Sequence, residues 1–491
     1  MTGTDILFTH SYFLRFDPKE LRAMTPYPPL GTLYAASVAR TLGLTPALFD
    51  SMLAGRESDI VPLIRRLRPR AVAIYDDDFN YLTKMCLSRM REAAFTLVRL
   101  AREEGCTVIV HGSDAADHAE EYIARGADYV LCGEGEGPLT ELLRALFNGT
   151  GDPRAVEGIA CTADGRVRRN AVRPHARDLD SLPMPAWDLI DAHRYRELWM
   201  KHHGYFSLNM VTTRGCPFHC NWCAKPIYGQ TYASRSPAHV VTEMLHLRDA
   251  FSPDHIWFCD DIFGLKPGWI EEFSAEVQRR GALIPFKCLA RVDLLLKPGV
   301  IEHLSASGCA SVWVGAESGS QKILDAMEKG TTVGQIYEAS RRLQSAGIRT
   351  GFFLQFGYPG ETLADIERTL TMVRECRPDD IGISVSYPLP GTPFYESVRR
   401  SLGGKKNWTV SEDLDLMFPG AFPPDFYRAL HAVTHKRLRI WQGLDQAREL
   451  ARTPWNVSPA RLRRVALSVY HMATLPYYRR KMNELGKRIQ A

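Results

Sequence analysis

The 491-residue sequence has no uninterrupted apolar run of about 18 residues, which is close to the minimum length of a membrane-spanning helix. Its first residues, MTGTDILFTHSYFLRFD, lack a basic start followed by a long apolar stretch, so we expect no signal peptide. Cysteine is scarce: the 11 residues are odd in number and mostly scattered, which argues against a disulfide framework. These absences predict a reduced, cytoplasmic protein.

The charge balance is weak overall but uneven along the chain. The formal net charge is +5, yet the stretch from Arg428 to Ala491 holds 14 Lys and Arg against three acids. This stretch is either the solvated face of a helical tail or a contact for an anionic surface, meaning acidic lipid or nucleic acid. It lacks a helix-turn-helix pattern and interleaved stacking aromatics, so we expect no nucleic acid partner.

Residues 1–149 alternate short apolar strands with helical segments, which is typical of a doubly wound parallel α/β sheet. Strands are expected at 5–10, 45–50, 70–76, 106–112 and 127–134. Such sheets bind ligands beyond the carboxyl ends of their strands, where small residues let a large flat ligand approach the main chain. The GEGEG run also suits a plain turn. The candidate contacts in these loops are Leu30, Gly31, Tyr75, Asp76, Gly112, Ser113, Glu134, Gly135 and Glu136.

Three further regions follow. Residues 150–200 are expected to be a linker that contains a hairpin with an Asp164–Gly165 turn. Residues 201–400 resume the βα alternation with six strands, at 207–212, 255–259, 286–290, 311–315, 350–356 and 381–386. Six units fall short of eight, so a partial (β/α)6 barrel is expected, with its chemistry at the carboxyl ends of the strands. Residues 401–491 are predicted to be helical. Helices are also expected at 33–42 and 84–104 in the first region.

Three of the 11 cysteines, Cys216, Cys220 and Cys223, lie within eight positions directly after the first barrel strand. A closed structural zinc site needs four ligands, and no fourth cysteine or paired histidine lies at the usual spacing. An iron–sulfur cluster fits better because cubane clusters take thiolates from tight loops. Three cysteines on four irons leave one iron open to an outside ligand.

RGCPFHCNWC resembles the signature of the radical S-adenosylmethionine (SAM) enzymes, C-x3-C-x-aromatic-C, with Trp222 in the aromatic place. In that family a 4Fe–4S cluster chelates SAM through its open iron. An electron from the cluster cleaves SAM to a 5′-deoxyadenosyl radical. The resemblance implies an enzyme whose electrons come from an external donor of flavodoxin or ferredoxin type.

The resemblance also implies SAM contacts in the later barrel loops. Asp260 and Asp261 would accept hydrogen bonds from the SAM amine, although the family's glycine-rich form is absent and the two acids also suit a helix cap. Arg291 would pair with the SAM carboxylate and Glu317 would hold the ribose. A lone arginine, glutamate or glutamine at such a position is equally compatible with a purely structural role. Trp222, Gln355 and Tyr358 complete the set.

A doubly wound domain before such a barrel resembles the cobalamin-binding radical SAM subfamily, which includes C-methyltransferases and anaerobic magnesium-protoporphyrin ester cyclases. PPLGTLYAASVARTLG and ADYVLCGEGEGPLTELL carry this resemblance. The D-x-H-x-x-G motif is absent, so we expect cobalt without a histidine ligand.

The resemblance implies methylation of an unactivated carbon of a small or lipophilic metabolite. Ring formation or rearrangement with cobalamin is the alternative, and a non-catalytic iron–sulfur or cobalamin sensor is a more remote one. In the tail, the apolar stretch around 462–475 with basic ends is either an ordinary packed helix or a peripheral membrane contact.

Overall fold

The computed structural model describes residues 3–79, 87–223, 225, 227–404, 407–408, 414–453, 455 and 458–487. Its internal contacts divide the chain into two compact units. The first unit holds Met1–Phe218, Lys225–Cys288 and Asn407–Asp413. The second unit holds His219–Ala224, Leu289–Lys406 and Leu414–Ala491.

The first unit contains a seven-stranded sheet in the order β2-β1-β3-β4-β5-β6-β7. Its strands are β1 (Ile6–Thr9), β2 (Pro46–Leu48), β3 (Ala71–Tyr75), β4 (Thr107–His111), β5 (Tyr129–Leu131), β6 (Ile159–Ala163) and β7 (Arg166–Arg169). Strands β1 to β5 pair in parallel, which confirms the five predicted strands and the doubly wound arrangement. Their almost continuous burial explains why the sequence runs are uniformly apolar.

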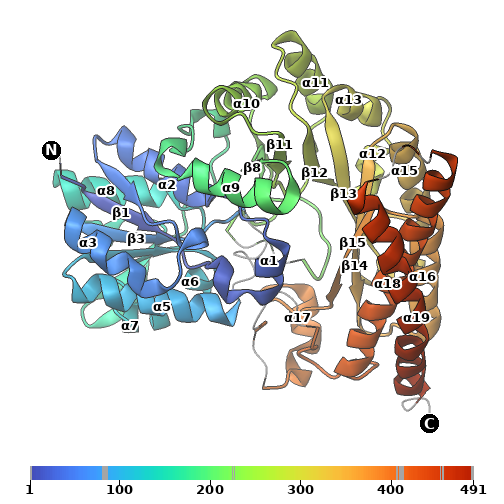
Figure 1. Cartoon of the computed structure of the whole chain (residues 1–491). Helices are drawn as coiled ribbons and strands as arrows, with labels where there is room; N and C mark the ends of the chain where they lie inside the picture. The colour runs from blue at the N-terminus through green and yellow to red at the C-terminus, as the bar shows by residue number, and fades with distance from the viewer. Residues whose placement is uncertain are drawn as a thin grey trace. The chain divides into compact units, whose positions relative to one another are not determined.

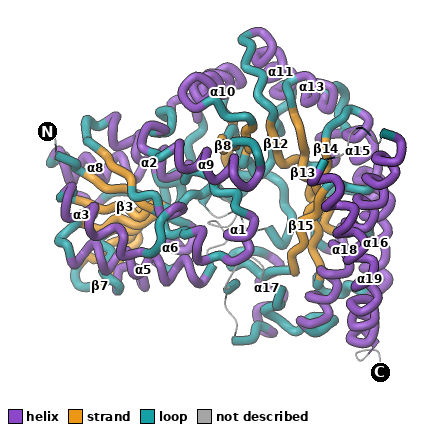
Figure 2. The backbone as a smooth tube through the Cα atoms, in the orientation of Figure 1, coloured by secondary structure: helices purple, strands orange, loops and turns teal. Residues whose placement is uncertain are grey.

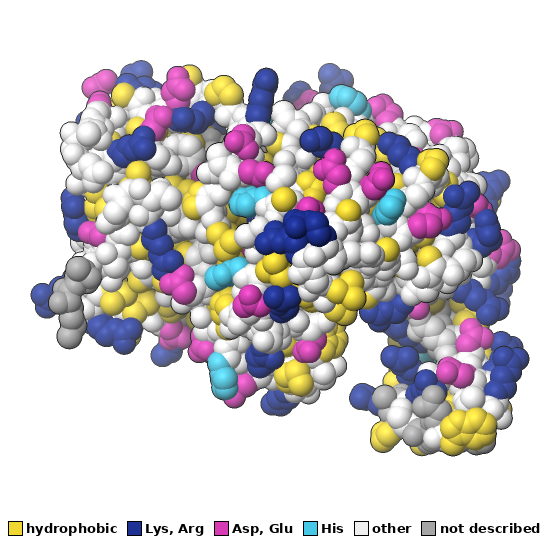
Figure 3. Space-filling model, turned by 90° about the horizontal axis from the view of Figure 1, so that it is seen from above, with side chains coloured by type: hydrophobic (Ala, Val, Ile, Leu, Met, Phe, Trp, Pro, Cys, Tyr) yellow, Lys and Arg dark blue, Asp and Glu magenta, His cyan; other side chains and the backbone are white. Residues whose placement is uncertain are grey.

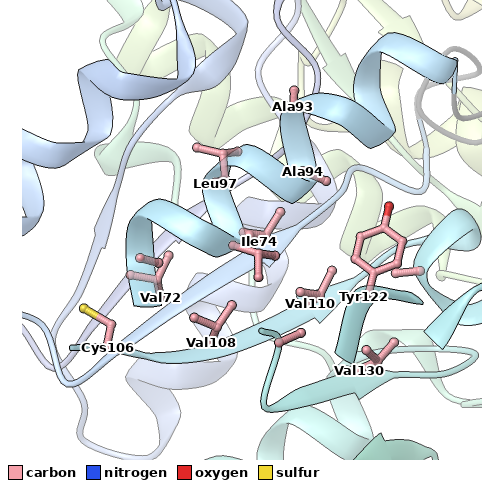
Figure 4. Packing of buried hydrophobic residues seen from close by; sticks show 14 of the residues in the cluster. Val72, Ile74, Ala93, Ala94, Leu97, Cys106, Val108, Val110, Tyr122 and Val130 are labelled. Carbon is pink, nitrogen blue, oxygen red and sulfur yellow. The ribbon is translucent and has the colours of Figure 1, made fainter. Parts of the chain in front are cut away.

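Helices cover both faces of this sheet (Figure 1). One face is covered by α2 (Leu30–Thr41) and α8 (Glu136–Asn148), and the other by α3 (Val61–Leu67), α5 (Ser88–Glu103) and α7 (Ala119–Ala124). In Figure 4, Leu97 of α5 lies over Ile74 and Val108 of the strands. Two short helices, α1 (Pro18–Ala23) and α6 (Ser113–Asp117), follow β1 and β4. The helix expected at 84–104 begins at Ser88, and residues 84–86 lie outside the described part.

The hairpin expected in the linker forms, but it belongs to the sheet. Strand β6 pairs antiparallel with β5 and with β7, and Asp164 and Gly165 both have positive φ, as the predicted Asp-Gly turn requires. The boundary at 149 therefore separates two strands that pair with each other. The physical reason is that β5 would otherwise leave its backbone groups unpaired at the edge of the sheet.

The rest of the first unit leads into a second sheet. Helix α9 (Ala192–His203) precedes β8 (Ser207–Met210), and β9 (Thr213–Arg214) pairs antiparallel with β10 (Ala233–Ser234). Helix α10 (Pro237–Phe251), β11 (His255–Phe258), α11 (Trp269–Arg279) and β12 (Phe286–Ala290) follow. The second sheet has the order β15-β14-β13-β12-β11-β8.

The remaining strands are β13 (Cys309–Glu317), β14 (Arg349–Phe356) and β15 (Asp380–Val385). All six predicted barrel strands are therefore confirmed within two residues at each end. The helices between them are α12 (Val292–Leu295), α13 (Val300–Ala306), α14 (Gln321–Ala326), α15 (Val333–Ser345) and α16 (Leu363–Cys376). Four of the strand pairs, β8–β11, β11–β12, β13–β14 and β14–β15, are parallel, as a partial (β/α)6 barrel requires.

The C-terminal part is helical, as expected, with α17 (Pro393–Val398), α18 (Pro424–Arg452) and α19 (Pro459–Lys487). Helices α18 and α19 lie side by side (Figure 2) and run antiparallel, because Lys436 bonds Thr474 at 2.8 Å while Gly443 meets Ser468. On the face seen in Figure 3, basic side chains are interspersed with acids. No helix among the described residues is long and apolar enough to cross a membrane.

Candidate active site

The cysteine-bearing loop begins where β9 ends. Gly215 has φ +77°, and a Cβ atom placed there would lie 2.3 Å from the carbonyl oxygen of Thr231, so only glycine fits. Cys216, Cys220 and Cys223 are all partly exposed. The backbone therefore brings the two ends of the loop together while its thiols stay within reach of a ligand.

Asp260 fixes the start of this loop. Its buried carboxylate accepts hydrogen bonds from the backbone N–H groups of Thr212 and Thr213, at 2.7 and 2.6 Å, and from both hydroxyls, at 2.9 Å. Burial raises the pKa of Asp260 to about 6, against the opposing effect of these bonds. Asp261 is exposed. The role of the two acids at the SAM amine stays a prediction, but Asp260 clearly holds the turn before the cysteines.

In the second unit, Asn221 and Tyr358 hold the segment between Cys220 and Cys223. The Asn221 side-chain amide donates to the carbonyl oxygen of Ala326 at 2.8 Å, and its backbone N–H donates to that of Met327 at 3.1 Å. The Tyr358 hydroxyl lies 3.0 Å from Asn221 Oδ1. Tyr358 was predicted to face the site, whereas Asn221 was missed because an isolated asparagine carries no signature.

Two cations lie close to Cys220. A guanidinium N–H of Arg291 lies 3.9 Å from Cys220 Sγ, and the same side chain pairs with Asp293 at 3.0 and 3.2 Å. Lys329 Nζ lies 2.8 Å from Glu317 Oε1. Burial lowers the pKa of Lys329, but the charges of Glu317 and Cys220 outweigh it and raise the pKa.

The other predicted SAM contacts of the second unit are Glu317, Gln355 and Trp222. Glu317, at the end of β13, has φ +55°, a strained value for a residue with a side chain, and its ion pair with Lys329 could not be foreseen from sequence. Gln355 is buried and donates to Ser386 Oγ at 3.0 Å. Trp222 packs its ring against a hydrophobic cluster that includes Phe394 and Phe418, and Lys329 Nζ lies 5.8 Å from its ring centroid.

The donor set fits an iron–sulfur cluster by its chemistry. The three thiols share one loop, Gly215 closes that loop, and Arg291 and Lys329 offset thiolate charge at Cys220. Within the described ranges, no three His, Cys, Asp or Glu side chains already converge as a metal site. The fit therefore rests on these donors and their surroundings.

The predicted contacts in the first sheet gather at the carboxyl ends of its strands. Asp76 accepts bonds from the Ser11 N–H at 2.7 Å and the Ser11 hydroxyl at 3.0 Å, and burial raises its pKa to about 6. The N–H of Gly31 donates to Asp77 at 3.0 Å. Gly112 has φ +148°, and a Cβ there would touch Asp76. Leu30, Tyr75 and Ser113 are buried beside them. The loops at this edge of the sheet thus contact one another, and their role as a ligand site stays a prediction.

Two buried histidines, His10 and His111, lie at the same edge of the sheet. His111 stacks on Tyr75 with 4.0 Å between ring centroids, and its Nε2 lies 3.0 Å from the carbonyl oxygen of Gly133. Burial lowers the pKa of His111 to about 4, so its ring is neutral at pH 7. His10 Nε2 lies 3.3 Å from Asp50. The sequence search for a D-x-H-x-x-G motif could not find either residue.

Arg214, the residue before Gly215, is buried among the first-domain loops. Its guanidinium pairs with Glu134 and, at 2.6 and 3.1 Å, with Glu136. The rings of Tyr34, Phe79 and Tyr228 lie between 5.3 and 5.7 Å from it. Gly135, between the two acids, has no room for a side chain, because a Cβ would lie 2.3 Å from the Tyr75 hydroxyl. Glu134 and Glu136 are therefore counter-ions of Arg214, and their role as ligand contacts stays a prediction.

Comparison with known proteins gives the class of the barrel. The model of the radical SAM superfamily matches residues 210–373. An uncharacterized methyltransferase of Pyrococcus horikoshii is 27% identical over 401 residues, which cover 80% of this chain and 83% of that protein. The anaerobic magnesium-protoporphyrin IX monomethyl ester cyclase of Cereibacter sphaeroides is 28% identical over 282 residues, 55% of this chain and 45% of the cyclase.

A solved structure shares the fold over nearly the whole chain. The cobalamin-dependent S-adenosylmethionine radical enzyme OxsB, with aqua-cobalamin and S-adenosylmethionine bound, matches with a TM-score of 0.71 and 17% identity, covering 96% of this chain and 71% of OxsB. At this identity the likeness shows the fold alone. The match to the superfamily model indicates that residues 210–373 are a radical SAM domain.

Replacing Arg214 by Met should lower the free energy of unfolding by about 3–5 kcal/mol, because it leaves two buried carboxylates without a cation. Urea denaturation measures this loss. The triple variant Arg214→Met, Glu134→Gln, Glu136→Gln is the matched control, and it should recover most of the stability. An Arg214→Met protein as stable as the wild type would contradict this account.

Proposed function

We propose that this chain is a cobalamin-dependent radical SAM methyltransferase that methylates an unactivated carbon of a small or lipophilic metabolite. The observation that carries the proposal is the cysteine triplet after the first barrel strand, with Arg291 and Lys329 beside Cys220. The methyltransferase relative and the fold shared with OxsB, which binds cobalamin and SAM, support it.

In this proposal Cys216, Cys220 and Cys223 hold a 4Fe–4S cluster, which supplies the electron that cleaves SAM. Trp222, Asp260, Asp261, Arg291, Glu317, Gln355 and Tyr358 line the SAM site. Arg291 and Lys329, each already paired with an acid, are the cations near Cys220, and Asp260 and Asn221 keep the loop in place. Reducing electrons reach the cluster from a flavodoxin- or ferredoxin-type donor.

Cobalamin binds at the carboxyl ends of β1 to β5 in this proposal. The contacts are Leu30, Gly31, Tyr75, Asp76, Gly112 and Ser113, with Gly135 and its flanking acids Glu134 and Glu136 shaping the loop around Arg214. The bare backbone of Gly112, which has a positive φ, lets the Asp76 side chain pack against it and keeps these loops together. When bound, cobalamin supplies a transferable methyl group.

Ring formation remains the second candidate, favoured by the cyclase relative. The two reactions differ in the fate of the SAM methyl group. With SAM carrying a labelled methyl, a methyltransferase places the label in its product, whereas a cyclase does not.

Single Cys→Ala variants at positions 216, 220 and 223 should each lose the absorption near ~400 nm that such clusters show, since three ligands are the minimum for this site. Iron and sulfide analysis after anaerobic reconstitution checks the result. Cys309→Ala is the matched control, because Cys309 is buried in β13 away from the loop, and it should keep its iron. Unchanged iron in all three loop variants would remove the basis of the cluster site.

Cobalamin in the reconstituted protein should show no axial imidazole from the protein. His111 is neutral, stacked on Tyr75 and bonded through its Nε2 atom to Gly133, and the Nε2 atom of His10 lies 3.3 Å from Asp50, so the Nε2 atom of each buried ring already has a partner. Electron paramagnetic resonance of the cob(II)alamin form reads the axial ligand directly. A nitrogen superhyperfine pattern that persists in His10→Gln but disappears in His111→Gln would assign a ligand to His111 instead, and failure to retain any corrinoid would refute the site.

We also propose a peripheral membrane contact through α19. Leu462, Val469 and Tyr477, which share one helix face by their spacing, are 52%, 58% and 65% exposed. Arg463, Arg479 and Arg480 flank this face, and each basic residue near an anionic surface contributes about 1 kcal/mol. A lipophilic substrate would then be taken from the membrane surface.

Co-sedimentation with liposomes tests this contact. The protein should bind vesicles that contain anionic lipid more strongly than neutral ones, and the double variant Leu462→Gln, Val469→Gln should lose most of this binding. The control Leu444→Gln removes an exposed leucine of α18 and should bind as the wild type does. Equally weak binding to both lipid mixtures would leave α19 as part of the fold only.

A further inference from the structure

A row of three side chains crosses the barrel strands of the first unit. Asn209 of β8 is in register with Trp257 of β11, and Trp257 is in register with Lys287 of β12. Residues in register on neighbouring strands point to the same face of a sheet. The three side chains therefore share one face.

That face is opposite to the one covered by helix α11. The alternate residues Phe258 and Phe286 pack ring against ring at 5.1 Å, and both meet Phe273 of α11, at 5.9 and 6.0 Å. The strand alternation then places Lys287 on the inner face of the barrel, away from its helices.

Aromatic rings surround the Lys287 ammonium group. It lies 4.6 Å from the ring centroid of Trp257 and 5.4 Å from that of Tyr27, and these two rings are 4.7 Å apart. The segment of Tyr27 is fixed by two hydrogen bonds, one between its hydroxyl and Ser207 Oγ at 3.1 Å and one from the Asn209 amide to the Pro28 carbonyl oxygen at 3.0 Å. Lys287 itself is partly exposed.

Two polar groups of this row, the Lys287 ammonium group and Asn209 Oδ1, lack an ion-pair or hydrogen-bond partner among the described residues. Among the described residues, no carboxylate forms an ion pair with Lys287. Burial lowers the pKa of Lys287 to about 8, outweighing the opposite effects of Cys259 and of Glu20 in α1. Asn209 is 2% exposed, and its Oδ1 has no hydrogen-bond partner in the part of the chain that is described. Buried polar atoms are normally satisfied, so an unsatisfied one on the same face as an unpaired cation, with Trp257 between them, points to a ligand.

We propose that Lys287 binds an anionic oxygen group of the substrate, a carboxylate or a phosphate, and that Asn209 Oδ1 accepts a hydrogen bond from the same molecule. The aromatic walls favour a substrate with a flat or apolar body next to the acid. Nothing else in the row neutralises the ammonium group, so the substrate would bring the counter-charge. This inference rests on the proposed function for its use in catalysis, but not for the binding itself.

Competitive acetylation with acetic anhydride, read by mass spectrometry on the full-length protein, tests the site without turnover. The probes are benzoate and phenyl phosphate, with benzamide as the neutral analogue. Benzoate or phenyl phosphate should slow labelling of Lys287 at least about threefold, while benzamide leaves it unchanged, and the better protector distinguishes a carboxylate from a phosphate. The exposed Lys266 is the internal control and should react equally in all samples. Labelling of Lys287 that no acid slows, or no labelling at any pH, would overturn the proposal.

Calorimetric binding of the better probe provides the second measurement. Lys287→Met should weaken binding at least about tenfold, Lys287→Arg should keep it within about threefold, and Lys266→Met should not change it. Binding to the wild type should weaken as the pH rises through about 8, since the neutral amine no longer attracts the anion.

Lys287→Met should abolish this pH dependence, which excludes Glu20, Cys259, His255 and the Tyr27 hydroxyl as its source. A dependence that survives in Lys287→Met would overturn the assignment. Both measurements remain valid in protein without iron or corrinoid, so their failure and that of the proposed function are separate results.

Discussion

The buried ion pairs of Arg214 are the constraint on which the first unit depends. A guanidinium out of water is tolerated only with its counter-charges in place, so β9 must stay next to the loop that carries Glu134 and Glu136. Tyr34, Phe79 and Tyr228 exclude water from this contact and strengthen it. The position of the residue before the cysteine loop is therefore set by the first sheet.

In the cysteine loop, some residues fix the backbone and others are left for the proposed chemistry. Asp260 and Asn221 form their side-chain hydrogen bonds with neighbouring turns and with Tyr358, and Gly215 leaves room for the Thr231 carbonyl oxygen. The cysteines are left partly exposed, with cations beside Cys220. A reactive group is held accurately when the surrounding residues lock its backbone, so that a ligand finds the loop already arranged.

Features that depend on neighbouring residues in the sequence were predictable. The barrel strands, the Asp164–Gly165 turn and the spacing of the three cysteines are local patterns, and each could be derived from alternation, turn chemistry or ligand spacing. Features that depend on contacts across the chain were not. Arg214 and Glu136 are 78 positions apart in the sequence, and Lys329 and Glu317 are 12 apart. None of these residues belongs to a sequence motif that indicates its partner. The pairing of β6 with β5 was missed for the same reason, because a hairpin sequence does not say which sheet edge it joins.

That hairpin also bears on how the protein behaves at high concentration. It places β7, with the sequence RVRR, at one edge of the sheet, and its Arg166 and Arg168 are exposed. A row of like charges along an open strand edge repels a second copy before backbone hydrogen bonds can form between them. The opposite edge is the three-residue β2, too short to template a long pairing. Resistance to edge-to-edge aggregation is therefore built into both sides of the sheet.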